Sequence, residues 1–143
     1  MTIRLKTDIV ILRSEREKCL EEIYIQQKKD KLQIHLEIEK LKDEVREKEF
    51  NIRDAIRKKC RHDINHLKNN KIKGRTKIYK ELMLKKKQLI LQSKQRETDT
   101  LYELRKRSRF EKQQIETKQY EKSVSIRNSI KHKIHELRYK SLD

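Results

Sequence analysis

The sequence predicts an all-α protein built from long helices, without a compact globular core. Charged residues make up 44% of the 143 residues and apolar residues 33%, whereas an ordinary globular domain has about 25% and about 45–50%. Proline is absent and glycine occurs once, so the residues that fold a chain back on itself are scarce. Low hydrophobicity with high net charge is also typical of disordered chains, but here the apolar residues recur at helical spacing. We therefore expect extended helices or a coiled coil.

The first expected element covers residues 1–72 and is an amphipathic helix that pairs with another helix. Its most regular section has apolar residues at steps of four, three, four and seven, the spacing of a coiled-coil seam. The seam residues are Ile34, Ile38, Leu41, Val45 and Ile52. The same frame, extended in both directions, places polar side chains on the seam at Gln27, Lys31, Lys48 and Lys59. Because the seam is imperfect, a homodimer through residues 34–52 and pairing with neighbouring helical proteins both stay open.

A bend or break is expected near Gly74, the only glycine in the chain. It follows Asn69 and Asn70, and Asn and Gly both accept the left-handed backbone that ends a helix. Lys71 and Lys73 suit the negative end of a helix dipole. A lone glycine inside a helix costs only about 1 kcal/mol, however. A hairpin, a kink and a continuous helix are therefore all compatible with the sequence.

The second expected element covers residues 73–143 and is a basic helical segment that contacts a filament or another polyanion. Its apolar stripe begins with Ile78, Leu82 and Leu89, and it is broadened by Met83, Leu84, Ile90 and Leu91. Residues 92–100 contain no large apolar side chain. Thr100 and Glu103 have the spacing of a capping box, which would open a further helix after a joint at residues 98–99. A continuous, solvated helix explains the same residues equally well.

Positive charge dominates the chain, with 40 Lys or Arg against 23 Asp or Glu and a net charge of +17. Residues 57–87 alone hold 13 basic and two acidic residues, a local charge of +11. Such a field indicates an acidic partner, although a charge run is often only a solvated helix face. The candidate contact residues lie in three clusters: Lys58, Lys59, Arg61, then Lys85, Lys86, Lys87, and then Arg105, Lys106, Arg107 and Arg109.

No catalytic, cofactor or membrane-spanning motif is recognised, so an enzyme is not expected. Cys60, His62, Asp63 and His66 form the one metal-like group, but their strongly cationic surroundings oppose a divalent cation, and ordinary helix residues explain them better. The longest aliphatic run spans only residues 9–12, far short of the roughly 20 residues that cross a bilayer. No signal peptide is expected from residues 1–8. Two cysteines provide no disulfide framework, which favours a reducing, cytoplasmic setting.

Residues 80–116 combine a Lys- and Arg-rich helix with interspersed Leu, Tyr and Phe side chains, as in Glu81-Leu-Met-Leu-Lys-Lys-Lys and Arg109-Phe-Glu. In this they resemble the short, basic, helical microtubule-associated proteins of ciliary axonemes. The resemblance implies a structural protein of the cytoskeleton, on the axoneme of a cilium or flagellum, that binds acidic tubulin. Basic side chains would supply charge, and the groove anchors would be Leu82, Leu89, Tyr102 and Phe110.

Two other functions fit the same sequence. A ribonucleoprotein component of the ribosomal type would bind nucleic acid through counterion release, since no base-reading motif is present. A generic coiled-coil scaffold would dimerise through residues 34–52. Preference for RNA over tubulin would favour the first, and self-association of residues 1–72 the second.

Overall fold

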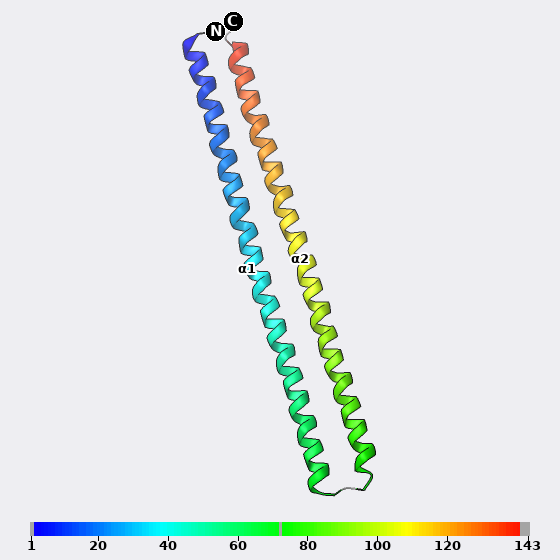
Figure 1. The fold of residues 1–143 in the computed structure, drawn as a ribbon. Coiled ribbons are helices and arrows are strands. Elements are labelled where there is room, and N and C mark those ends of the chain that lie inside the picture. Colours follow the sequence, from blue (N-terminus) through cyan, green and yellow to red (C-terminus); the bar gives the residue numbers. More distant parts are fainter. Residues whose placement is uncertain (1, 72, 141–143) are drawn as a thin grey trace. The chain divides into compact units, whose positions relative to one another are not determined.

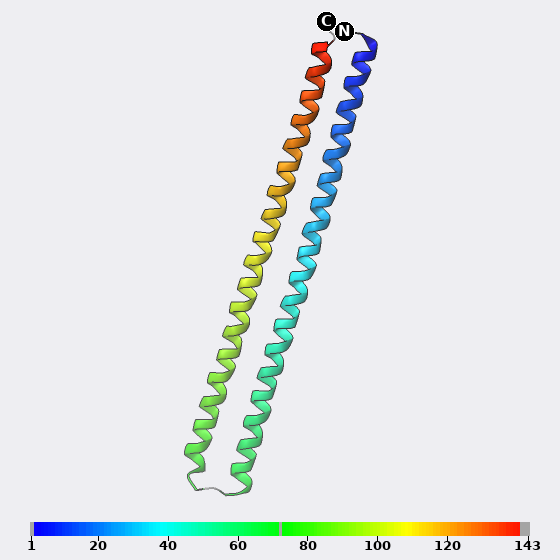
Figure 2. The same ribbon diagram turned by 180° about the vertical axis from the view of Figure 1, so that it is seen from behind.

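The computed structural model describes residues 2–71 and 73–140, which form two α-helices and no strand. Helix α1 spans Ile3–Asn69 and helix α2 spans Arg75–Lys140 (Figures 1 and 2). The predicted all-α class is confirmed. The chain divides into two compact units: unit 1 holds residues 1–36 and 108–143, and unit 2 holds residues 37–107. Within each unit a segment of α1 packs against a segment of α2. The boundaries predicted at residues 72 and 143 lie outside the described residues.

Polar side chains and unusual backbone angles fix where the helices begin and end. The Thr2 hydroxyl accepts a hydrogen bond from the Leu5 N–H at 3.2 Å, which makes Thr2 the N-cap of α1. At the other end of α1, the Asn70 side-chain amide donates to the His66 carbonyl at 3.1 Å. Gly74 has φ +70, and its carbonyl accepts the first two hydrogen bonds of α2, from Lys77 and Ile78, both at 3.1 Å. Asn70 therefore caps the end of α1, and Gly74 accepts the hydrogen bonds that begin α2.

Helix α2 runs without interruption through residues 98–103. The capping box that was one of two interpretations of Thr100 and Glu103 is wrong, and so is the joint before it. The Thr98 hydroxyl instead donates to the Lys94 carbonyl at 3.0 Å, and the Gln95 amide donates to Asp99 at 2.8 Å. These bonds to residues one turn away satisfy the polar groups within a continuing helix.

The main apolar cluster lies in unit 1. Leu5 and Ile9 of α1 meet Ile130 and Ile134 of α2, and all four are buried. Leu12, Ile126 and Leu137 are partly buried against them. Farther along the same unit the interface becomes polar: Gln119 is buried, and Lys31 forms an ion pair with Glu116. Unit 1 thus combines a short apolar cluster with polar contacts between its helices.

The centre of the unit 2 interface is a hydrogen-bonded polar network. Glu49 is only 5% exposed and Ser93 is fully buried. The Ser93 hydroxyl donates to Glu49 Oε2 at 2.6 Å, and Arg96 donates to both Glu49 oxygens at 3.2 Å. Arg53 bonds Ser93 at 3.4 Å and Glu97 at 3.2 Å. Every polar group in this network therefore has a partner, as burial requires.

Burial along α1 repeats every eleven residues. The buried side chains Ile38, Glu49 and Cys60 are spaced by eleven, and an apolar series with the same spacing runs through residues 12, 23, 34, 45, 56 and 67. The seven-residue frame drifts off this face, because an eleven-residue period gives 3.67 residues per turn and a heptad gives 3.5. Lys48 and Lys59, which made the extended heptad seam imperfect, are exposed, while Glu49 and Cys60 beside them are buried.

Candidate functional site: the basic turn of unit 2

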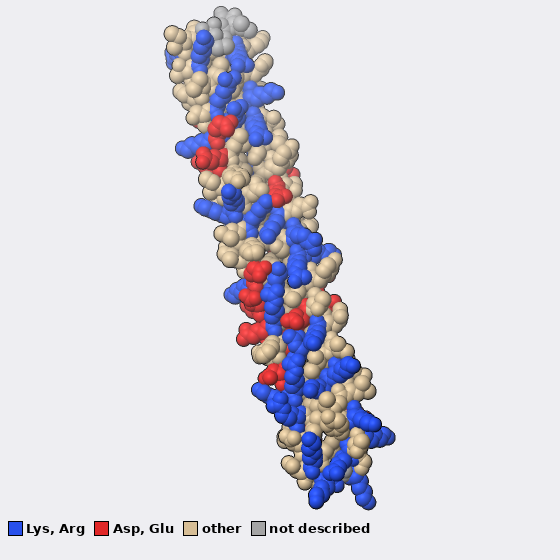
Figure 3. Space-filling model, in the orientation of Figure 1, with Lys and Arg blue, Asp and Glu red and all other residues tan. Residues whose placement is uncertain are grey.

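Residues 57–87, the basic turn, carry the entire net charge of unit 2. They hold 13 basic and two acidic residues, whereas the rest of the unit, residues 37–56 and 88–107, holds ten of each. Pairing of α1 with α2 brings the basic ends of the two helices together around the turn. On the face drawn in Figure 3, blue Lys and Arg atoms dominate this end. The charge that the sequence divides between two halves is thus collected at one end of unit 2.

The turn that links the helices requires its glycine for backbone reasons. The φ of Gly74 is +70, and a Cβ at this position would meet nothing within 4 Å. The left-handed backbone conformation, rather than lack of space, therefore favours glycine here. Lys71 also has a positive φ, 46. This turn places Lys71 and Lys73, both exposed, between the two basic helix ends.

Beneath the cations lies a small apolar core. Cys60 and Leu67 are buried, and the half-buried Leu82 and Leu89 of α2 line a cavity of about 120 Å³ with Cys60. Leu82 and Leu89 are thus engaged inside unit 2, because the inward face of α2 has to cover α1. The other two expected groove anchors, Tyr102 and Phe110, lie at the surface, and they are 55% and 59% exposed.

The predicted cationic residues lie largely at the surface. Nine of the ten are exposed, and Lys86 is half-buried. Six of them belong to the basic turn: Lys58, Lys59, Arg61, Lys85, Lys86 and Lys87. Arg105, Lys106 and Arg107 lie elsewhere in unit 2, and Arg109 lies in unit 1.

The first cations of the basic turn act on Asp54, which lies one turn before them on α1. A hydrogen bond from Lys58, whose Nζ lies 2.9 Å from Asp54 Oδ2, lowers the pKa of this carboxyl below its ordinary value. The charges of Lys58, Arg57 and Arg61 lower the pKa further. Nearby opposite charges thus favour the ionised form of this carboxyl, as expected beside a basic stretch.

Two members of the metal-like group of the basic turn, Cys60 and His66, make local contacts. The Cys60 thiol is buried, with its sulfur 3.9 Å from the Leu82 carbonyl oxygen. The His66 ring contacts the Asn70 side-chain amide at 2.9 Å. His62 is exposed. In the described ranges 2–71 and 73–140, no group of three His, Cys, Asp or Glu side chains is placed to hold a metal ion.

The five seam residues face the interior of the chain's own helix pairs. Ile38 is buried, and Ile34, Leu41, Val45 and Ile52 are half-buried. Ile34 belongs to unit 1 and the other four to unit 2. This face is therefore already partly covered within a single chain, and a homodimer through it would need the helices to separate.

Sequence reasoning missed the acidic and hydroxyl groups inside unit 2. Glu49 and Ser93 carry no apolar signal, and a hydropathy pattern assigns both to the surface. The eleven-residue spacing from Ile38 was the signal that places Glu49 inside. Leu84 and Leu91, which the sequence placed in the broadened apolar stripe of residues 78–91, are 57% and 55% exposed.

Comparisons with protein-family models, with curated proteins and with solved structures found no match for this chain. Neither described helix contains a stretch that is both long and apolar enough to span a membrane.

Proposed function

We propose that this protein is a non-enzymatic structural protein whose basic turn binds an acidic filament, the microtubule of the ciliary or flagellar axoneme. The observation that carries the proposal is the concentration of +11 in the basic turn, while the remainder of unit 2 is neutral. Attraction between exposed charges is screened beyond about 8 Å at physiological salt. A compact cationic patch therefore attracts a filament surface more strongly than the same charge spread along the chain.

Exposed aromatic side chains supplement the charge. Tyr79 lies in the basic turn and is 42% exposed, and Tyr102 is 55% exposed. Aromatic side chains with an apolar body and a polar edge are enriched at protein interfaces. We assign them the anchoring role, together with Phe110, because Leu82 and Leu89 pack inside unit 2.

We also infer that the helices form an extended coiled coil, which bends near Gly74 and has no globular core. The support is the small number of buried apolar side chains in the described residues, seven in all. Small-angle scattering from the isolated chain tests this inference. A compact, spherical monomer would contradict it.

Microtubule co-pelleting with matched charge variants tests the contact. The first variant replaces four exposed lysines of the basic turn by glutamine: Lys58, Lys59, Lys85 and Lys87. The control replaces four exposed lysines of unit 1 in the same way, Lys6, Lys18, Lys118 and Lys122, so that both variants have the same net charge. We expect the first to weaken binding at least about tenfold and the control less than about threefold. Equal losses would show that overall charge, rather than the basic turn, binds the filament.

The same variants separate the filament from nucleic acid. Titration with a structured RNA at several salt concentrations gives the number of phosphates neutralised. We expect RNA to bind more weakly than microtubules at about 0.15 M salt. Tighter binding to RNA than to microtubules, with a steep salt dependence, would favour a ribonucleoprotein component over a filament-binding protein.

A further inference from the structure

A second cationic feature lies in unit 1, separate from the basic turn. A groove of about 820 Å³ runs between α1 and α2. Five cationic side chains line it and only one acidic side chain, Glu17, does so. The cations are Arg13, Arg16, Arg127, Lys131 and Arg138.

Helical spacing and antiparallel pairing together create this cluster. On α1, Arg13 and Arg16 are three residues apart, and on α2 Arg127 and Lys131 are four apart, so each pair shares one helix face. The burial of Ile9 against Ile130 and Ile134 fixes the register of the two helices here. Neither helix alone holds the cluster, which exists only because the helices of unit 1 pair.

Acidic side chains near the groove only partly offset its charge. Arg16 pairs with Glu17 at 3.1 Å, and Glu17 is 67% exposed. On the other helix, His132 pairs with Glu136 at 3.1 Å. Since like charges held near one another repel, a bound anion relieves repulsion as well as adding hydrogen bonds.

The size and lining of the groove define the class of ligand. Small-molecule sites are typically about 300–1,000 Å³ in volume, and this groove falls within that range. Four of the five cations are arginines, whose planar guanidinium binds a phosphate through two parallel hydrogen bonds. Leu20 and Ile134 add an apolar part to the lining, which accommodates a carbon frame between the phosphates.

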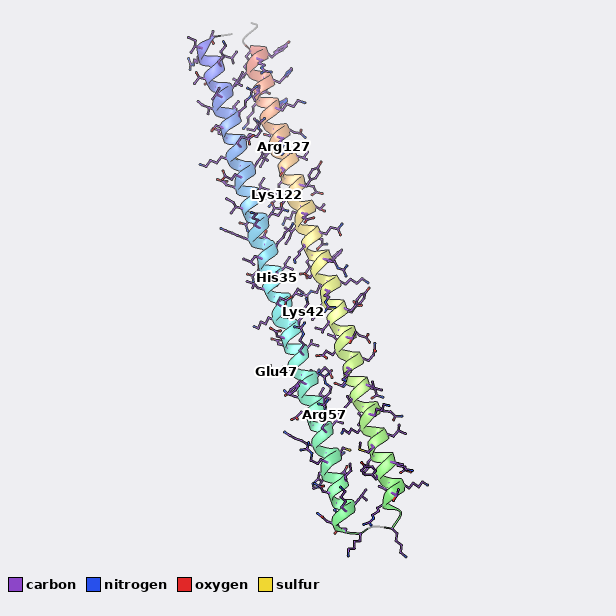
Figure 4. All side chains as sticks on the ribbon, in the orientation of Figure 1. His35, Lys42, Glu47, Arg57, Lys122 and Arg127 are labelled. Carbon is purple, nitrogen blue, oxygen red and sulfur yellow. The ribbon has the colours of Figure 1, made fainter. Side chains whose placement is uncertain are left out.

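We propose that the unit 1 groove binds a multiply phosphorylated small molecule, with Arg13 on α1 and Arg127 and Lys131 on α2 as the principal contacts. Figure 4 labels Arg127 on α2. All three side chains are exposed to solvent, so a ligand reaches them without any opening of the helix pair. This site is independent of the basic turn and of any filament.

Calorimetric titration of the full chain with inositol hexakisphosphate at about 0.15 M salt tests the proposal. We expect one molecule bound per chain. The variant with Arg13, Arg127 and Lys131 all replaced by glutamine should lose at least about tenfold in affinity. A control with Lys58, Lys59 and Arg61 replaced by glutamine has the same net charge and should stay within about threefold of the parent.

Equal losses in the two variants, or several molecules bound per chain, would overturn the proposal, because either result describes a diffuse ion atmosphere instead of a site. The Arg13→Lys, Arg127→Lys variant keeps the charge and the helix propensity and should still lose at least about threefold, since lysine cannot form the paired bonds. An unchanged affinity in this variant would show that the paired hydrogen bonds of arginine do not contribute to binding. Inorganic phosphate, with one group, should bind more weakly, because it can contact fewer of the cations at once.

Discussion

Replacing Glu49 by glutamine should destabilise the protein far more than the same change at Glu47. Glu49 is 5% exposed and accepts hydrogen bonds from Ser93 at 2.6 Å and from Arg96 at 3.2 Å. Glu47, labelled in Figure 4, is exposed. The two substitutions remove the same charge from the same helix, two residues apart. Their difference therefore measures the buried network.

The expected size of the effect follows from the exposure of the partners. A hydrogen bond to a charged group contributes about 1.5–3 kcal/mol net. The Arg96 side chain is 52% exposed, so its contribution is that of a surface pair, about 0.2–1 kcal/mol. Glutamine keeps an acceptor for Ser93 but no longer attracts Arg96. We expect Glu49→Gln to lower the free energy of unfolding by about 1–2 kcal/mol and Glu47→Gln to change it by less than about 0.5 kcal/mol.

The stabilisation contributed by Glu49 depends on pH, and the direction of its pKa shift decides whether that stabilisation is lost in acid or in base. Hydrogen bonds from Arg96 and Ser93 lower the pKa of Glu49 below its ordinary value of 4.5. A lowered folded-state pKa means that the stabilisation is present in full above pH 4.5, declines as pH falls below it, and disappears below the folded-state pKa. The difference between the parent and Glu49→Gln should therefore be constant near neutral pH and shrink in acid.

Urea unfolding followed by circular dichroism at 222 nm, between pH 3 and pH 7, measures both effects. Unfolding of Glu49→Gln and Glu47→Gln at the same urea concentration at pH 7 would contradict a stabilising buried network. A loss of unfolding free energy in Glu49→Gln that is as large at pH 3 as at pH 7 would contradict it as well. Either outcome would mean that Glu49 is solvated and its network does not hold the helices together.

Three further predictions concern the turn, the apolar cluster and the thiols. Gly74→Ala should cost about 1–2 kcal/mol in urea unfolding, because φ is +70 at a position with open space; no loss would mean the turn has another conformation. Ile9→Ala should cost about 2–3 kcal/mol, as Ile9 is 4% exposed, against under about 1 kcal/mol for Val10→Ala, 62% exposed; equal costs would refute the unit 1 register. Cys19, half-buried, should react with a thiol reagent faster than buried Cys60, with equal rates in denaturant; equal native rates would place Cys60 at the surface.

The sequence alone was enough for the helical class and the location of the excess charge. These properties are local. A chain without proline and with one glycine has few ways to end a helix. Among the described residues, positive φ occurs at Gly74, as the sequence suggested, and at Lys71, but not at Asn69 or Asn70. Charge is a sum over residues and needs no fold. The all-α prediction is confirmed, whereas the sequence left a hairpin, a kink and a continuous helix at Gly74 all open.

Only the tertiary structure decided which side chains face inward. A heptad frame and an eleven-residue frame agree over Ile34, Ile38, Leu41 and Val45 and then diverge, and the choice depends on how α2 lies against α1. That contact buries Glu49, turns Leu82 inward and brings the two sides of the unit 1 groove together. The physical reason is that helix formation depends on neighbours in sequence, whereas burial and electrostatic contacts between helices depend on a register set by residues far apart in the chain.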